Sequence, residues 1–249
     1  MPDPVSPAAS PPLAVTLAAW AGWRDVPGGP QEAGWSAVPA TAQAVPVLLR
    51  RRIDRAGQAA LRLAWNMAAS GAARIVASSR HGAFARSLAI MRAAQAGEPA
   101  SPSEFSLSVH HAMAGLLSIA RTNRAGHTAV AAGAESLAAG LLEAAVGLGL
   151  PESEAGASGR AGALLMHLDE PLPAPFDVLL PPAPACALVL ALMPDGPGQK
   201  LEIRLEPGAG AGTEKNDAET ALWHFLATPD CPEAVVGQGR LALRLRRAG

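Results

Sequence analysis

Apolar side chains recur along this chain in two alternating rhythms. Short continuous apolar runs are typical of buried strands, and between them lie segments whose apolar residues return every three or four positions, as on one face of a helix. The helical segments begin with one that starts at Pro46, with an apolar face from Leu49 to Met67, and one over residues 81–95. The strand-type runs are LAVTLAAW (13–20), RIVASS (74–79), ALLMHL (163–168) and CALVLALM (186–193). This alternation predicts an α/β protein built in layers.

A third helix has the best-marked start in the sequence. Ser101, Pro102 and Glu104 match a capping box with proline at the first helical position. Apolar residues then follow at four-residue spacing and predict a stripe along one face of a single helix: Phe105, Val109, Met113 and Leu117.

The stretch HTAVAAGAESLAAGLLEAA (127–145) predicts a strand over Thr128–Ala132, a glycine turn and a core helix over Ser136–Gly147. Tight strand-to-helix turns of this kind hold nucleophiles in many enzymes, because the free N–H groups at the helix start stabilise an oxyanion. Here the turn carries Ala134 and Glu135, and Ser136 is its only hydroxyl. A structural, capping role for this serine is favoured over a nucleophilic one.

The remaining segments complete a three-part organisation. Residues 1–12 predict a disordered, proline-rich tail, and a Gly/Pro-rich loop follows the first strand as far as about residue 45. CALVLALM and KLEIRLE (200–206), joined by PDGPGQ, predict a hairpin. We therefore expect a main domain over residues 13–207, and over 208–249 a flexible loop with a terminal helix and strand.

Composition excludes several classes of protein. The formal net charge of the 249 residues is −1, and tyrosine is absent, so nothing favours nucleic-acid binding. No basic residue precedes the first apolar run, as a signal peptide would need, so this run is interpreted as a buried strand. The longest uncharged stretch, 178–194, is interrupted by prolines and is not expected to form a membrane-spanning helix. Cys186 and Cys231 have no metal-ligand spacing and are interpreted as free thiols rather than a disulfide. We expect a cytoplasmic protein without membrane insertion.

Other motifs have ordinary interpretations. GAGAGTEK (208–215) fits neither phosphate-loop spacing, and G-x-S-x-G is absent. The six histidines show no ligand spacing, so we expect neither a metal site nor a cofactor. The arginine run RRRIDR (50–55) is interpreted as a solvated helix face, with an acidic partner as the alternative.

Residues 74–145 resemble the N-terminal half of the β-ketoacyl synthases, which have the thiolase fold. The resemblance rests on RIVASSRHGAF and on SPSEFSLSVHHAMAGLLSIARTNRAGHTAVAAGAES, with matching positions at Gly115, Ser118, Ile119 and Gly126. FSLSVHHAMAGLLSIA and AGAESLAAGLLEA are closer still to the short β-ketoacyl synthase-like N-terminal domain family. Members of that family look like chain-length-factor partners of ketosynthases in aryl-polyene-type pathways. The resemblance implies a layered sheet with a buried helix.

What the resemblance implies for activity is a loss. The place of the catalytic cysteine falls on Glu135 or Ala134, and the sequence contains neither the HGT nor the GGHN motif of the synthases. Without a thiolate and without those histidines, covalent catalysis and carbanion stabilisation are both missing. We therefore expect no catalytic residue in this chain.

The resemblance also implies a role for this chain in a complex. It suggests a heterodimer with a β-ketoacyl synthase, and a transient contact with an acyl carrier protein. The expected partner interface is the strand Thr128, Ala129, Val130, Ala131 and Ala132. The expected pocket-shaping residues are Phe105, Val109 and Met113. Two alternatives stay open: a carrier-docking or scaffold module that uses the arginine run, and an independent acyl-transfer or hydrolytic enzyme that uses Ser136 or Glu135.

Overall fold

The computed structural model describes residues 11–37, 45–51, 53–99, 101–149, 162–180, 183–207, 217–237 and 239–248. Two predicted features lie outside these ranges: most of the tail at 1–12 and the start of the flexible loop at 208–212.

The described strands form one mixed sheet in the order β4-β3-β5-β6-β1-β7-β9-β8, with β2 paired to β1. β3 runs parallel to both β4 and β5, and every other pairing is antiparallel. The strands are β1 (Leu13–Val26), β2 (Gly29–Ser36), β3 (Arg74–Ser78), β4 (His127–Val130), β5 (Ala163–Asp169), β6 (Cys186–Met193), β7 (Gln199–Pro207), β8 (Glu233–Val236) and β9 (Leu241–Arg247).

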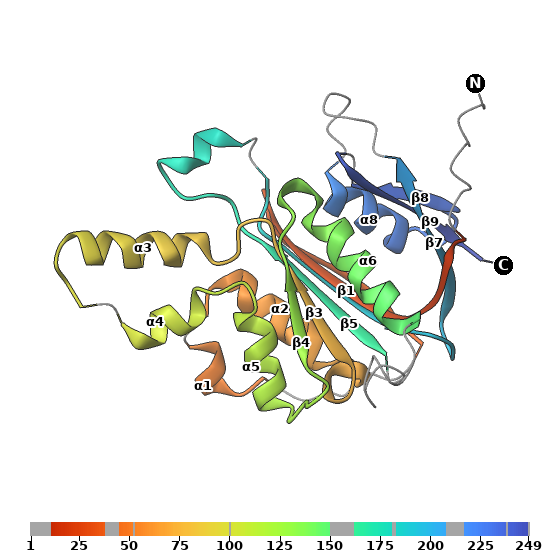
Figure 1. The fold of residues 1–249 in the computed structure, drawn as a ribbon, viewed down its shortest axis with the longest axis horizontal. Helices are drawn as coiled ribbons and strands as arrows, with labels where there is room; N and C mark the ends of the chain where they lie inside the picture. The colour runs from red at the N-terminus through yellow and green to blue at the C-terminus, as the bar shows by residue number, and fades with distance from the viewer. Residues whose placement is uncertain are drawn as a thin grey trace, which may run out of the picture.

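Helices cover both faces of this sheet, so the α/β prediction is confirmed (Figure 1). α2 and α5 pack on one face and α6 and α8 on the other, while α3 and α4 form an arm that projects away from the sheet (Figure 1). The α-helices are α1 (Val47–Arg50), α2 (Arg55–Trp65), α3 (Phe84–Gln95), α4 (Pro102–Leu107), α5 (Ala112–Ala120), α6 (Ser136–Gly149) and α8 (Ala218–Ala227). Three short 3₁₀ turns are η1 (Ala68–Gly71), η2 (Gly133–Glu135) and η3 (Phe176–Leu179).

The two covered faces explain why the central strands read as continuous apolar runs. In β6 the odd-numbered residues from 187 to 191 join the core beneath α2 and α5. The even-numbered Leu188, Leu190 and Leu192 join the core beneath α6 and α8. A strand buried on both faces has no polar side to alternate with, so its whole length is apolar.

The first strand is longer than predicted, and the expected loop after it is wrong. β1 continues through Trp23 to Val26, then turns at Gly28 and Gly29, which have φ values of 98° and 119°, and returns as β2. Only glycine adopts such φ values readily, so the Gly/Pro-rich segment is the turn of a hairpin.

The predicted β6–β7 hairpin is also wrong, because β1 lies between these two strands. Thr16 pairs with Met193 of β6, and Leu13 pairs with Ile203 of β7. The connection between β6 and β7 therefore crosses from one side of β1 to the other. Gly198 in this connection lies against the backbone of Leu17, where a Cβ atom would clash.

Two predicted helices are each divided in two. The segment from Pro46 to Met67 contains α1 and α2, and Asp54 begins α2 by accepting a hydrogen bond from the Gly57 N–H at 2.6 Å. The helix predicted after Ser101 ends as α4 at Leu107, and α5 begins at Ala112. At the break, the Ser108 hydroxyl donates to the carbonyl of Phe105 at 2.8 Å, a local bond that competes with helix continuation.

The sheet continues past residue 207. β9 pairs with β7 along its whole length, β8 pairs with β9, and Leu222 and Phe225 of α8 are fully buried in the core beneath α6. The domain boundary at 207 remains a prediction; the strand predicted beyond it joins the same sheet, and the predicted helix packs on one face of that sheet.

Candidate functional site

The strand predicted as a partner interface forms one edge of the sheet. β4 stands at the end of the strand order and pairs only with β3 among the described strands. Ala129, Ala131 and Ala132 are exposed, and Thr128 and Val130 are half-buried. The strand itself covers His127–Val130, so Ala131 and Ala132 lie in the turn that follows it.

The free side of β4 presents backbone groups to the outside. The carbonyls of Gly126 and Val130 accept hydrogen bonds from Ile75 and Ser79, so the even-numbered residues face β3. In a parallel ladder the alternate residues then direct their N–H and C=O groups away from the partner. The backbone groups of His127 and Ala129 therefore form an open edge that another strand can pair with.

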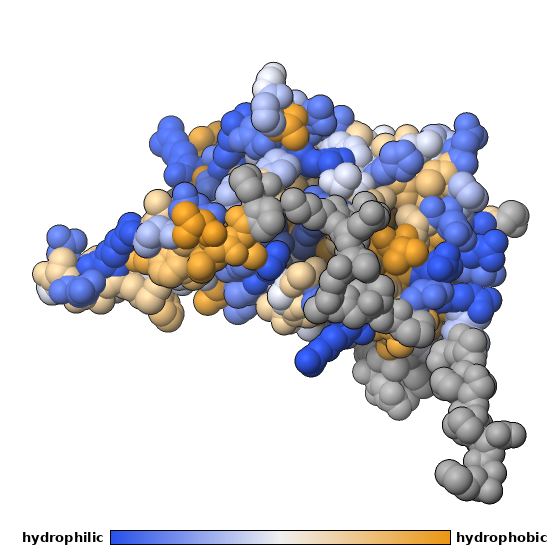
Figure 2. Space-filling view, turned by 90° about the horizontal axis from the view of Figure 1, so that it is seen from above, coloured by the Kyte–Doolittle hydropathy of each residue, from blue (hydrophilic) through white to orange (hydrophobic). Residues whose placement is uncertain are grey.

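Exposed apolar side chains lie on the elements around this edge. Ile119 of α5 is 80% exposed, and Val146 of α6 is 39% exposed. On the projecting arm and the η3 turn that packs on it, Phe105, Val178 and Leu179 are also exposed. Figure 2 shows apolar side chains gathered on the arm side of the molecule. Large exposed apolar patches occur at protein or membrane interaction sites and in ligand-binding grooves.

The turn after β4 is held by the side chain of Ser136. Ser136 is 1% exposed, and its Oγ accepts from the Ala132 N–H at 2.9 Å and donates to the Gly133 carbonyl at 2.8 Å. Gly133 has a φ of 60°. Ala134 is exposed, and Glu135 is half-buried at the end of η2. The serine thus closes the turn, in agreement with its predicted structural role.

The predicted pocket-shaping residues do not lie on one helix face. Phe105 is on α4 and is 63% exposed, Val109 is in the break, and Met113 is on α5. Val109 and Met113 pack against the core beneath α2 and α5, and the Met113 sulfur lies 3.0 Å from where a Cβ atom at Gly57 of α2 would be. Of the three, Phe105 is the residue most available to a partner.

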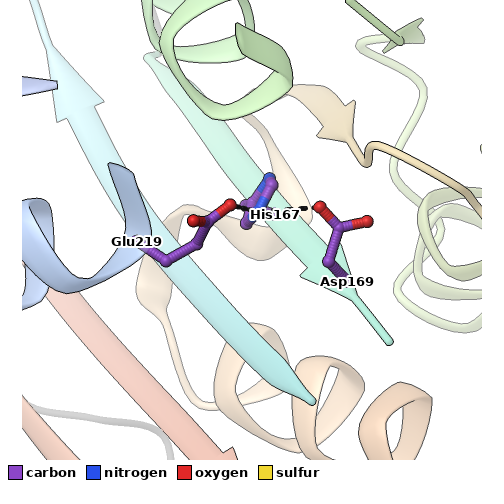
Figure 3. Close-up of side chains that lie close together, drawn as sticks. All are labelled: His167, Asp169 and Glu219. Carbon is purple, nitrogen blue, oxygen red and sulfur yellow. Dashed lines mark hydrogen bonds and ion pairs between the residues drawn. The ribbon is translucent and has the colours of Figure 1, made fainter. Parts of the chain in front are cut away.

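The structure also contains a polar site, separate from the β4 edge, that the sequence did not predict. His167 and Asp169 from β5 meet Glu219 from the first turn of α8 (Figure 3). His167 is fully buried; its Nε2 lies 3.1 Å from Glu219 Oε1 and 3.4 Å from Asp169 Oδ2, and its Nδ1 lies 2.9 Å from Ser78 Oγ.

Burial and neighbouring charges shift the pKa values of the side chains in and beside this cluster. Burial alone would lower the pKa of His167, but contacts with Cys186, Glu219 and Asp169 together raise it well above its usual value. Burial alone would likewise raise the pKa of Glu219, and its hydrogen bonds with His167 and Asp217 instead lower it to about 2. Burial raises the pKa of Asp217 to about 6, helped by the neighbouring Glu219.

The sequence contained half of the signal for this cluster. His167 and Asp169 are two residues apart in a strand and therefore share a face. Nothing local connects them to Glu219, which the fold brings in from a distant helix. The prediction that no metal site exists rested on spacing along the chain alone, which cannot detect such a grouping.

Of the other residues singled out in the sequence, Cys186 contacts His167 of this cluster. Arg55 of the arginine run pairs with Asp25 at 2.9 Å, and Arg50 and Arg51 are exposed. Cys186 and Cys231 are free thiols, as predicted. A hollow of about 700 Å³ lies between β2, β7 and the end of α8, where Arg247 is already bonded to backbone carbonyls. Among the described helices, none is long and apolar enough to cross a membrane.

The layered sheet, with a short edge strand that leads through a glycine turn into a buried helix, defines a thiolase-like, ketosynthase-type fold. The chain belongs to the family described as beta-ketoacyl synthase, N-terminal domain, whose model matches residues 20–235. The match extends beyond residue 207, where the expected main domain ends.

One solved structure carries the same fold over nearly the whole chain. It is titled "Ketosynthase (ApeO) in Complex with its Chain Length Factor (ApeC) from Xenorhabdus doucetiae". The superposition covers 94% of this chain and 100% of that chain, with a TM-score of 0.74 and 19% sequence identity. No curated protein sequence matches the chain.

Proposed function

We propose that this chain is a non-catalytic, chain-length-factor-like subunit that pairs with a β-ketoacyl synthase and shapes its acyl pocket. The observation that carries the proposal is the open outer edge of β4, where the backbone groups of His127 and Ala129 have no strand partner among the described residues. The family membership and the likeness to a chain from a ketosynthase–chain length factor complex support this choice of partner.

The chemistry of the turn supports the non-catalytic part of the proposal. A condensing enzyme needs an exposed nucleophile at the head of its buried helix. The hydroxyl of Ser136 is committed to two backbone bonds, and neither Ala134 nor Glu135 offers a thiolate. These bonds also argue against an independent acyl-transfer or hydrolytic enzyme that uses Ser136.

The uncovered surface supports an obligate complex. An unpaired edge strand with small apolar residues is prone to aggregate unless a partner covers it. Ile119 and the exposed residues of the arm extend this surface beyond the strand. A synthase subunit that adds its own edge strand to β4 would bury the strand and the neighbouring apolar residues together. Phe105, on the arm, is the side chain we place closest to the partner's acyl pocket. Acyl carrier protein would contact this complex only transiently.

The experiment is co-expression with the β-ketoacyl synthase encoded nearest to the chain, followed by size-exclusion chromatography with light scattering. We expect a stable 1:1 complex, and self-association of the chain when it is expressed alone. Ala129→Pro removes the outward N–H and should abolish the complex, because proline cannot donate to a ladder. Ala129→Ser keeps the N–H and a small side chain, and should retain it. A well-behaved monomer with no affinity for the synthase would overturn the proposal.

A further inference from the structure

The second site has the composition and geometry of a metal centre. One ligand atom from each of His167, Asp169 and Glu219 lies within 4.8 Å of the other two (Figure 3). Figure 3 shows the imidazole between the two carboxylates, one from its own strand β5 and one from α8. One imidazole and two carboxylates form a mixed nitrogen and oxygen donor set of the kind that binds Zn²⁺.

The far side of two of these ligands is fixed by other groups. Ser78 Oγ lies 2.9 Å from His167 Nδ1, which sets the orientation of the ring and leaves Nε2 directed at the carboxylates. Asp169 Oδ1 accepts from Ser79 Oγ at 2.8 Å and from the Arg80 N–H at 2.7 Å, while Oδ2 is turned toward His167. Metal sites in proteins are held in this way by a shell of outer hydrogen bonds.

A single proton on Nε2 accounts for the hydrogen bond with Glu219 but leaves Asp169 without an N–H of its own. Nε2 lies 3.1 Å from one carboxylate and 3.4 Å from the other, and one N–H bond cannot point well at both oxygens. Ligands that surround one tetrahedral Zn²⁺ at their usual bond lengths lie roughly 3.3 Å apart. The two separations around Nε2 bracket that value.

The burial of the three side chains leaves a route for an ion and for a water ligand. The His167 side chain is fully buried, whereas those of Asp169 and Glu219 are 16% and 21% exposed. An ion can therefore approach from the carboxylate side, where water can complete a four-coordinate shell. Ca²⁺ and Mg²⁺ prefer six or more oxygen ligands and fit this set less well.

We propose that His167, Asp169 and Glu219 bind one Zn²⁺ ion, which fastens α8 to the end of β5. The site joins α8 to β5, and both elements lie within the residues that the family model matches. It does not depend on the proposed pairing with a synthase, and its test uses the isolated chain without any partner.

The test is Zn²⁺ titration of the chelator-treated, full-length chain by calorimetry, together with thermal unfolding with and without Zn²⁺. We expect one equivalent to bind and raise the Tm, and an equal concentration of Mg²⁺ to leave the Tm unchanged. Co²⁺ in place of Zn²⁺ should give the visible absorption of a four-coordinate ion, which reports direct coordination rather than stability.

Variants distinguish this site from adventitious binding at the surface. Glu219→Gln and Asp169→Asn keep the shape of each side chain and should weaken Zn²⁺ binding at least about 100-fold, because removing a ligand costs more than removing an outer-shell partner. His127→Gln is the matched control, because His127 lies beside His111 at the surface, with ring centroids 5.3 Å apart. It should leave binding intact. Absence of saturable binding, or binding that survives both carboxylate changes, would overturn the proposal and leave a proton on His167 as the charge between the carboxylates.

Discussion

The strands at the two ends of the strand order, β4 and β8, are equally short, but only β8 carries charged side chains that are paired with its neighbour. On β8, Glu233 pairs with Arg244 at 2.9 Å and with Arg246 at 3.4 Å, both on the neighbouring β9. Charged side chains on an edge strand prevent it from pairing with another chain. β4, HTAV, carries no carboxylate, lysine or arginine, and Ala129 is exposed beside its free backbone groups.

The difference shows that this chain can protect a sheet edge and does so at only one of its two ends. Exposed apolar residues lie near both ends: Ile119 on α5 and Val146 on α6 beside β4, and Val235 on β8 itself. Because of its paired charges, the β8 edge is interpreted as the outer boundary of the assembly. The β4 edge is interpreted as a surface that needs a cover.

Giving β4 the protection that β8 already has should produce the largest effect. Ala129→Lys places a charge on the free edge, and we expect affinity for the synthase to fall at least about 100-fold, or about 2.7 kcal/mol, since an unpaired charge at an interface costs several kcal/mol. Titration calorimetry measures the affinity. The Tm of the chain alone should stay within about 2 °C of the original value. Equal affinity for the variant would remove β4 from the interface.

The stability of the folded chain should depend on Met113 more than on Phe105. Met113→Ala removes a contact with α2 at Gly57 and should lower the free energy of unfolding by about 1–2 kcal/mol, below the range for a fully buried methionine. Phe105→Ala, at an exposed position, should change it by less than about 0.5 kcal/mol. Denaturant titration compares the two. A larger loss for Phe105 would show that the arm packs more tightly than its exposure indicates.

Removing the charge from β8 should make the two edges more alike. Glu233→Val breaks the pairs with Arg244 and Arg246, and we expect the Tm to change by no more than about 3 °C, because exposed ion pairs contribute little. The informative readout is light scattering across a range of concentrations, in which the variant should self-associate more than the parent chain. Unchanged association would show that β8 is protected by something other than its charges.

A smaller effect should appear in the products of the complex. If the arm lies beside the acyl pocket of the synthase, Phe105→Ala should shift the products toward longer chains and Phe105→Trp toward shorter ones. Product profiling of the reconstituted complex tests this, with Met113→Ala as the comparison that alters packing. Identical profiles for both Phe105 variants would leave β4 with a purely structural partnership.

No effect at all is expected from restoring a thiol at the turn. Glu135→Cys and Ala134→Cys should show no carbon–carbon bond formation in the isolated chain, because the histidines of a synthase are not supplied. Mass spectrometry of the unaltered chain after exposure to an acyl-loaded carrier should likewise detect no adduct on Glu135 or Ser136. A stable adduct would contradict the non-catalytic assignment.

What the sequence predicted well was local, and what it missed was brought together from a distance. The apolar runs located β3, β5 and β6, and the small-residue run located β4 and α6. The expected pairing of β6 with β7 was wrong because a short connection normally makes a hairpin, and nothing in it indicates that β1 lies between them. The sequence did not predict the break between α4 and α5 at Ser108, because the four-residue apolar spacing continues through it. Glu219 could not be joined to His167 without the fold.

The central position of β1 has a consequence for how the chain is made. The first strand pairs with β6 and β7, which lie far along the sequence. The ladder between Leu13 and Ile203 therefore cannot form until both segments are available. Pairings between such distant segments close late and slow folding, and until then β1 remains exposed apart from its hairpin with β2. A chain still attached to the ribosome therefore cannot complete its sheet before β7 has emerged. Any truncation that removes β6 and β7 should yield an aggregating fragment rather than a smaller version of the protein.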